Sequence, residues 1–153
     1  MDLILMAAEL RRDEGVRYVL YYDTKGIPST GVGRNLRASP LPAGWVYPLS
    51  DAQVDQLLNS DLANTFAQLD HSLPWWRGLD EVRQRVVANM CFNLGIGTLM
   101  TFHNTLGAMR RGAYAVAAAG MKASAWHGQV GQRAARLCQA MESGVMPDEP
   151  VVT

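Results

Sequence analysis

The chain has 153 residues, and its 14 basic and 14 acidic side chains give a formal net charge of zero. A general nucleic-acid binder or an anionic-membrane binder needs an excess of Lys and Arg, so this charge argues against both kinds of partner. The length allows one compact domain or two small lobes that share a core, and it requires neither a disulfide nor a metal for stability.

The cysteines and histidines give no sign of a metal site. Cys91 and Cys138 lie far apart in helix-like surroundings and resemble small buried hydrophobic residues, which points to a reducing cytosol. His71, His103 and His127 are isolated from one another, so no metal-ligand spacing is present. The apolar start of the chain is too short to span a membrane and lacks the basic start of a signal peptide, which predicts a cytoplasmic product without membrane insertion.

The first third of the chain predicts a short helix followed by a small sheet. Residues 3–13 place apolar side chains at helical spacing, and Gly15 is a natural stop just beyond them. Residues 18–36 change to β-branched and aromatic side chains with the turn signals DTKG and GVG, which predicts a small antiparallel sheet with tight turns. Residues 37–48 are rich in Pro and Gly and form a connection without a sustained period.

The rest of the chain predicts helices. Ser50 and Gln53 form a capping-box signature ahead of about twenty residues of helical apolar spacing. Asp80 is placed to cap a second helix. Further helical patterns, separated by Gly or by the segment WHGQVG, cover about 99–110, 112–124 and 130–142. Residues 144–153 are expected to form a flexible tail.

Two acids in the first third are candidates for chemistry. Glu14 lies at the end of the first predicted helix, where the negative end of the helix dipole favours a protonated carboxyl and hence a general acid. Asp23 lies in the segment YYDTKG. Each also has an ordinary interpretation, a solvated helix end for Glu14 and turn chemistry for Asp23. Two acids across a cleft are able to divide the work of glycoside hydrolysis.

The spacing of this segment resembles the catalytic segment of phage-type lysozymes, the T-even phage lysozyme family (glycoside hydrolase family 24). The matching elements are Glu14-Gly15, Asp23-Thr24, Ser29 and Gly31-Val32-Gly33. The resemblance extends over most of the chain, through DEVRQRVVANMCFNLG (80–95), FHNTL (102–106) and WHGQVGQRAAR (126–136).

The resemblance implies an α+β, lysozyme-like fold with a small β-hairpin or sheet lobe, a larger all-helical lobe and an active-site cleft between them. On this hypothesis residues 1–143 form a single catalytic domain. It would consist of an N-terminal helix over 1–14, a β lobe over about 15–48 and a helical lobe over about 50–143. The connection over 37–48 looks shorter than in the family and is expected to lack its extra helix.

The implied activity is that of an endolysin, a muramidase that hydrolyses the β-1,4 bond between N-acetylmuramic acid and N-acetylglucosamine in peptidoglycan, with inversion and without a cofactor. The enzyme would be a monomer. It would wait in the host bacterial cytoplasm until a holin-like protein permeabilises the membrane, and would then reach the cell wall. One alternative is a lytic transglycosylase, against which Asp23 and Ser29 argue. Another is a non-catalytic wall-binding module.

The same resemblance assigns roles to the candidate residues. Glu14 becomes the general acid and Asp23 the second carboxylate, while Arg133 corresponds to the arginine that pairs with the catalytic Glu. Ser29 stands in place of the Thr that helps to hold the attacking water. Because neighbours on a strand face opposite sides, only one of Ser29 and Thr30 is able to point at the cleft, and the choice stays open.

Arg34 stands where family members often have a His that pairs with an acid, and the counterpart of that acid here is Asp61. We therefore predict an Arg34–Asp61 ion pair. The resemblance also predicts that sugar contacts come from Asn35, Phe92, Asn93 and Thr105. Trp126 is expected to be structural, supporting the segment that carries Arg133.

Overall fold

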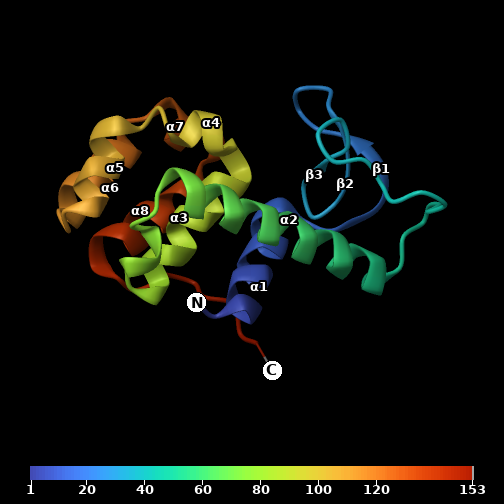
Figure 1. Cartoon of the computed structure of the whole chain (residues 1–153), viewed down its shortest axis with the longest axis horizontal. Helices are drawn as coiled ribbons and strands as arrows, with labels where there is room; N and C mark the ends of the chain where they lie inside the picture. Colours follow the sequence, from blue (N-terminus) through green and yellow to red (C-terminus); the bar gives the residue numbers. More distant parts are fainter. Residues whose placement is uncertain (153) are drawn as a thin grey trace. The chain divides into compact units, whose positions relative to one another are not determined.

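The computed structural model describes residues 1–152 and divides into two compact units (Figure 1). One unit comprises residues 7–64 and carries the sheet. The other comprises residues 1–6 and the chain from Thr65 onward, and it is helical. The division falls within helix α1 (Leu3–Glu14) and within helix α2 (Asp51–Ser72). The predicted α+β class is confirmed, whereas the cleft stays a prediction.

The sheet has three antiparallel strands in the order β1 (Arg17–Tyr22), β2 (Pro28–Gly31) and β3 (Arg34–Asn35). The register of β1 and β2 shifts between Arg17 and Tyr21, so β1 contains a bulge. Residues 37–48 form no helix, as expected. The buried apolar side chains of this unit come from α1, from the end of the hairpin, from the connection before α2 and from α2 itself, namely Ala7, Leu10, Val32, Leu49, Val54, Leu57, Leu58 and Leu62.

Helix α2 begins with the predicted capping box. The Ser50 backbone N–H donates to Gln53 Oε1 at 2.9 Å, and the Gln53 backbone N–H donates to Ser50 Oγ at 3.1 Å. The two residues thus satisfy donors that the start of a helix otherwise leaves unpaired. None of the helices within residues 1–152 combines the length and the apolar character that crossing a membrane requires.

The helical unit continues from α2 through a short 3-10 turn, η1 (Trp76–Gly78), into six further α-helices. These are α3 (Glu81–Leu94), α4 (Ile96–Leu99), α5 (His103–Arg110), α6 (Tyr114–Lys122), α7 (Ala125–Val130) and α8 (Gln132–Ser143). Helix α8 packs against α3, α6 and α7, and α5 packs against α6. As predicted, Asp80 caps α3 by accepting a hydrogen bond from the Arg83 backbone N–H.

Two of the predicted boundaries in this unit are wrong. The pattern at 99–110 is broken, because Phe102 has a non-helical backbone and the Thr101 hydroxyl donates to the Thr98 carbonyl at 2.6 Å. The segment WHGQVG is not a separator, since α7 occupies most of it and is capped by Ser124. Gly131, with a φ of +58°, is the residue that divides α7 from α8.

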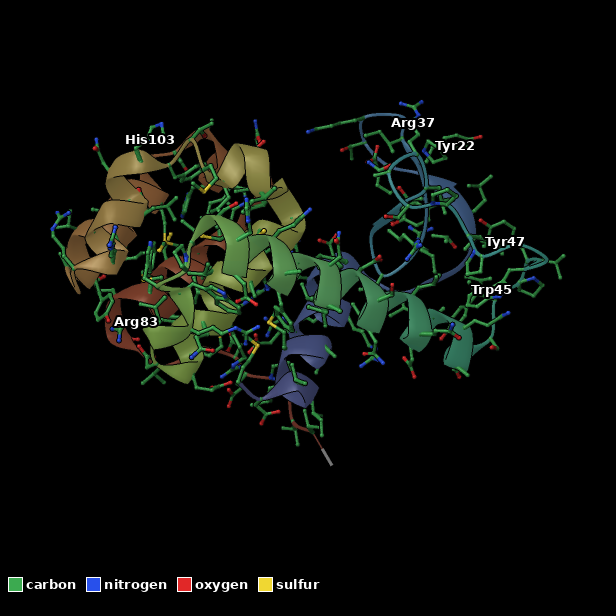
Figure 2. All side chains as sticks on the ribbon, in the orientation of Figure 1. Tyr22, Arg37, Trp45, Tyr47, Arg83 and His103 are labelled. Carbon is green, nitrogen blue, oxygen red and sulfur yellow. The ribbon has the colours of Figure 1, made fainter. Side chains whose placement is uncertain are left out.

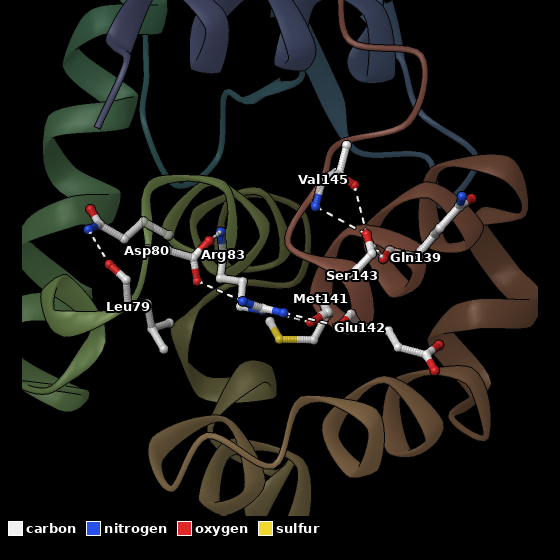
Figure 3. A network of polar contacts seen from close by, with 9 residues as sticks. Leu79, Asp80, Arg83, Gln139, Met141, Glu142, Ser143 and Val145 are labelled. Atoms are coloured by element: carbon white, nitrogen blue, oxygen red, sulfur yellow. Dashed lines mark hydrogen bonds and ion pairs between the residues drawn. The ribbon is translucent and has the colours of Figure 1, made fainter.

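Arg83 joins the start of α3 to the end of α8 (Figure 3). Its Nε donates to the Met141 carbonyl at 2.7 Å, and its Nη2 donates to the Glu142 carbonyl at 3.0 Å. Its guanidinium carbon lies 3.6 Å from the centre of the Tyr114 ring. Arg83 therefore satisfies carbonyls that the C-terminus of a helix leaves without intrahelical donors.

The segment that follows α8 makes specific contacts with the helical unit. Met146 is buried, and Glu149 Oε1 lies 2.7 Å from Nη2 of the buried Arg85. The flexibility expected for residues 144–153 stays a prediction, and Thr153 lies outside the described residues.

Candidate active site

Glu14 is the last residue of α1, and the glycines around it fix its surroundings. The Gly15 N–H donates to the Arg11 carbonyl at 2.9 Å and its φ of +74° ends the helix. Gly33 brings the backbone of the hairpin against the Glu14 carboxyl. A Cβ atom added at Gly33 would lie 2.6 Å from Glu14 Oε2 and 2.8 Å from its Cδ. The second glycine of the Gly-x-Gly motif thus leaves room for the Glu14 carboxyl, and any side chain at position 33 would occupy that room.

Asp23 is held in a turn by its own side chain. Its Oδ1 accepts hydrogen bonds from the backbone N–H groups of Lys25 at 2.8 Å and of Ile27 at 2.9 Å. Turn chemistry and a catalytic role do not exclude each other here. The turn uses Oδ1 and fixes the side chain, while Oδ2 is left for other chemistry.

Ser29 and Thr30 are both buried on β2, and each hydroxyl donates to a backbone carbonyl. Ser29 Oγ donates to the Ile27 carbonyl at 3.1 Å, and Thr30 Oγ1 donates to the Val19 carbonyl at 3.0 Å. Val19 lies in the bulged part of β1, where the regular backbone hydrogen bonding between strands is interrupted. The Thr30 hydroxyl therefore pairs with the Val19 carbonyl in place of a backbone N–H. Ser29 pairs directly with Tyr21 and shares its face of the sheet. Which hydroxyl holds water stays a prediction.

The predicted ion pair between Arg34 and Asp61 is confirmed, with Arg34 Nη1 2.7 Å from Asp61 Oδ1. The other nitrogens of Arg34 donate to the carbonyls of Ser39 at 2.8 Å and of Pro40 at 2.9 Å. Burial raises the pKa of Asp61 above its ordinary value, and the charge of Arg34 offsets part of that rise. Arg34 therefore ties β3 and the loop after it to α2, and the two carbonyl partners could not be read from the sequence.

In the helical unit, Arg133 is oriented by a residue that the sequence did not single out for function. Arg133 Nε donates to Oδ1 of the fully buried Asn89 at 2.8 Å. One turn further along α3, Asn93 Oδ1 accepts a hydrogen bond from Trp126 Nε1 at 2.8 Å. Trp126 is thus structural, as expected. The only sequence signal for Asn89 is an amide in an otherwise apolar part of a helix.

The remaining predicted sugar contacts lie in different settings. Asn35 is exposed, and its Oδ1 accepts from the backbone N–H groups of Arg37 at 2.9 Å and of Ala38 at 3.2 Å. Phe92 is half-buried on α3. Thr105 is buried and lines a surface cavity of about 490 Å³ together with residues 101–104, Gly120 and Ser124.

The predicted residues fall into two groups that correspond to the two units. The sheet-bearing unit carries Glu14, Asp23, Ser29, Thr30, Arg34, Asn35 and Asp61, and the helical unit carries Phe92, Asn93, Thr105 and Arg133. The pairing of Arg133 with Glu14 and every sugar contact stay predictions.

Comparison with known proteins gives consistent matches. A family model described as "Phage lysozyme" matches residues 11–141. The chain is 29% identical to the "Pre-baseplate central spike protein Gp5" of Enterobacteria phage T4, over 91% of this chain but only 28% of that protein. It is 25% and 23% identical to "Probable T4-type lysozyme 1" and "Probable T4-type lysozyme 2" of Dictyostelium discoideum, over 90% and 91% of this chain and 93% and 94% of those proteins.

Proposed function

The chain belongs to the phage lysozyme family, and from this premise we propose that it hydrolyses the β-1,4 bond between N-acetylmuramic acid and N-acetylglucosamine in peptidoglycan. The observation that carries the proposal is the fit of the Gly33 backbone around the Glu14 carboxyl. A backbone shaped to one carboxyl, together with a second carboxyl of the same unit that is fixed in a turn, suits a reaction that needs two acids in different roles.

In the proposed mechanism Glu14 protonates the leaving glycosidic oxygen. Asp23 activates water on the opposite face of the sugar through the oxygen that its turn leaves available, and Ser29 helps to hold that water. This arrangement inverts the anomeric centre. No metal or organic cofactor takes part in the proposed reaction.

The first test replaces Glu14 by Gln, which keeps the shape of the side chain but cannot act as the acid. Loss of a general acid reduces turnover by about 10²–10⁴-fold, and we expect a loss of this size in the clearing of purified peptidoglycan, with the folded state retained by circular dichroism. The exposed Glu142→Gln variant is the control. Unchanged activity in Glu14→Gln would refute the role of Glu14.

The same variant separates an enzyme from a non-catalytic wall-binding module. If the protein is a binding module, Glu14→Gln should change neither its sedimentation with peptidoglycan nor any other effect that it has on the cell wall. An enzyme predicts that sedimentation with insoluble peptidoglycan persists while the release of soluble fragments stops.

Asp23 requires two variants because its side chain also holds the turn. Asp23→Asn keeps an acceptor for the Lys25 and Ile27 N–H groups, whereas Asp23→Ala removes both the acceptor and the charge. We expect both variants to lose turnover, and only Asp23→Ala to lose stability as well. Near-normal turnover in Asp23→Asn would contradict the assigned role.

The products decide between hydrolysis and transglycosylation and also report the stereochemistry. Mass spectrometry of the digested wall should show hydrolysed muramic acid ends, and anhydro-muramic ends would instead identify a lytic transglycosylase. Nuclear magnetic resonance of the first product should show the inverted anomer. The retained anomer would mean that Asp23 acts as a nucleophile.

For the biological role we propose an endolysin that acts at host cell lysis, reaching the wall from the host cytoplasm after a holin-like protein has permeabilised the membrane. The similarity to a phage spike protein supports a second candidate, a lysozyme module carried in the phage particle. Mass spectrometry of purified particles separates the two. A fixed stoichiometry in the particle supports the spike module, and absence from the particle together with delayed lysis on gene deletion supports the endolysin.

A further inference from the structure

Tyr21 differs from the other residues of β1. It is half-buried, whereas every other residue of that strand is exposed. In the antiparallel ladder Tyr21 is the direct partner of Ser29. Directly opposed residues of two antiparallel strands lie on the same face with adjacent side chains. The phenol of Tyr21 therefore shares its face of the sheet with the hydroxyl that is the leading candidate for holding water.

The charges around Tyr21 come from the two candidate catalytic acids and one base. Burial raises the pKa of the Tyr21 phenol above its ordinary value, and the negative charges of Glu14 and, to a lesser extent, Asp23 raise it further. The charge of Arg17 acts in the opposite direction, and its guanidinium carbon lies 4.9 Å from the centre of the Tyr21 ring. The phenol thus stays protonated and able to donate a hydrogen bond at any pH at which the enzyme would work.

We propose that Tyr21 is a positioning residue of the reaction proposed above, whose phenol donates a hydrogen bond to the attacking water from the Ser29 face of the sheet. Arg17 holds the ring by a cation–π contact. Asp23, two residues further along the chain, supplies the carboxylate that takes the proton of that water. Ser29 and Tyr21 then share the task of orienting one water molecule toward the sugar.

Replacement of Tyr21 by Phe removes the hydroxyl and keeps the ring that Arg17 contacts. Loss of one positioning hydrogen bond is expected to lower kcat about tenfold with KM and the thermal midpoint unchanged. The matched control is Tyr22→Phe, since Tyr22 (labelled in Figure 2) is 67% exposed and, as the next residue of the strand, faces the opposite side of the sheet. That control should retain kcat within about twofold.

A role in packing alone predicts a different result, because the ring survives in Tyr21→Phe. In that case kcat would match the unaltered enzyme, and the proposal would be wrong. A loss of stability together with an unchanged kcat would overturn it in the same way.

A second measurement needs no activity and therefore separates this inference from the proposed function. The titration of the Tyr21 phenol is followed by carbon-13 resonance of labelled tyrosine. Glu14→Gln and Asp23→Asn should each lower its pKa because a negative charge that opposes the phenolate is removed, and Arg17→Gln should raise it.

If neither acid variant moves the titration, Tyr21 does not lie with the two acids and the inference fails, even in an active enzyme. If the shifts occur but the unaltered protein does not cleave peptidoglycan, the proposed function fails and the role of Tyr21 in it fails too.

Discussion

The two units of the molecule hold some of the predicted site residues in different ways. In the sheet-bearing unit the hydrogen-bond partners of Asp23 and Ser29 are close in sequence, since Asp23 Oδ1 accepts from the N–H groups two and four residues later and Ser29 Oγ donates to the carbonyl two residues earlier. In the helical unit they are far apart, since Arg133 and Asn89 are separated by 44 residues and Trp126 and Asn93 by 33.

This difference indicates what a substitution should do in each unit. Turns and glycines in the sheet-bearing unit set the positions of reacting groups, so changes there should reduce activity more than stability. Buried hydrogen bonds in the helical unit connect distant helices, so changes there should reduce stability, because an unpaired buried polar group is costly.

The largest effect is expected for Gly33→Ala. The new Cβ would overlap the Glu14 carboxyl and displace it, and a displacement of about 1 Å at a reacting group costs on the order of a hundredfold in rate. Gly26→Ala is the matched control, because Gly26 also has a positive φ, +75°, but has no atom within 4 Å of the added Cβ. Both variants should lose similar stability, and only Gly33→Ala should lose peptidoglycan cleavage. Equal activity in the two would mean that the close approach is irrelevant to catalysis.

The interior of the helical unit should protect Cys91 from thiol reagents. Burial raises the pKa of this thiol to about 11. At pH 8 the reactive thiolate is then about a hundredfold scarcer than for a cysteine with the ordinary thiol pKa of 9.0. A Cys138→Ala variant, in which Cys91 is the only thiol, should react with a disulfide reagent about a hundredfold more slowly when folded than in urea. Rapid labelling of the folded protein would show that this core opens readily.

Asn89→Ala should destabilise the protein by about 1–3 kcal/mol, because the buried Arg133 would lose an acceptor for its Nε. Urea unfolding measures the change, with the exposed Gln139→Ala as the control on α8. A loss no larger than that of the control would mean that the hydrogen bond contributes little, and the contrast between the units would weaken.

The smallest effect is expected for the surface pair between Arg11 and Asp55, which are 2.5 Å apart with side chains 37% and 52% exposed. Pairs of this kind contribute less than about 1 kcal/mol because water and salt screen them. A double-mutant cycle with Arg11→Gln and Asp55→Asn should give a coupling energy in that range, falling as salt is added. A coupling energy larger than the destabilisation caused by Asn89→Ala would reverse the expected order.

The features that depend on sequence-local signals were predictable. The capping box of Ser50 and Gln53, the Asp80 cap and the hairpin carrying Asp23 all arise from residues a few positions apart. The Arg34–Asp61 pair was also predicted, although its residues are 27 positions apart, because the family resemblance links them.

Features that depend on tertiary packing were not predictable in the same way. Nothing local to Asn89 indicates that it accepts a hydrogen bond from Arg133, and nothing local to Arg83 indicates that it binds the carbonyls at the end of α8. The break at Phe102 and the helix across WHGQVG were missed because short helical segments depend more on packing than on their own propensity. The setting of Tyr21 depends on strand register, which no residue near it in the sequence indicates.

Position 34 holds Arg where the family often has His. As a result, the ion pair that joins β3 to α2 is sensitive to acid but not to alkali. A guanidinium keeps its proton throughout the range in which proteins function, whereas an imidazole loses its proton near pH 6.5. The Arg34–Asp61 pair therefore has no alkaline limit in that range. At low pH the pair is lost when Asp61 takes up a proton. Burial favours this protonation because it raises the pKa of the Asp61 carboxyl. A member of the phage lysozyme family with this arginine keeps the ion pair in alkaline surroundings, where a histidine at the same place would have become neutral.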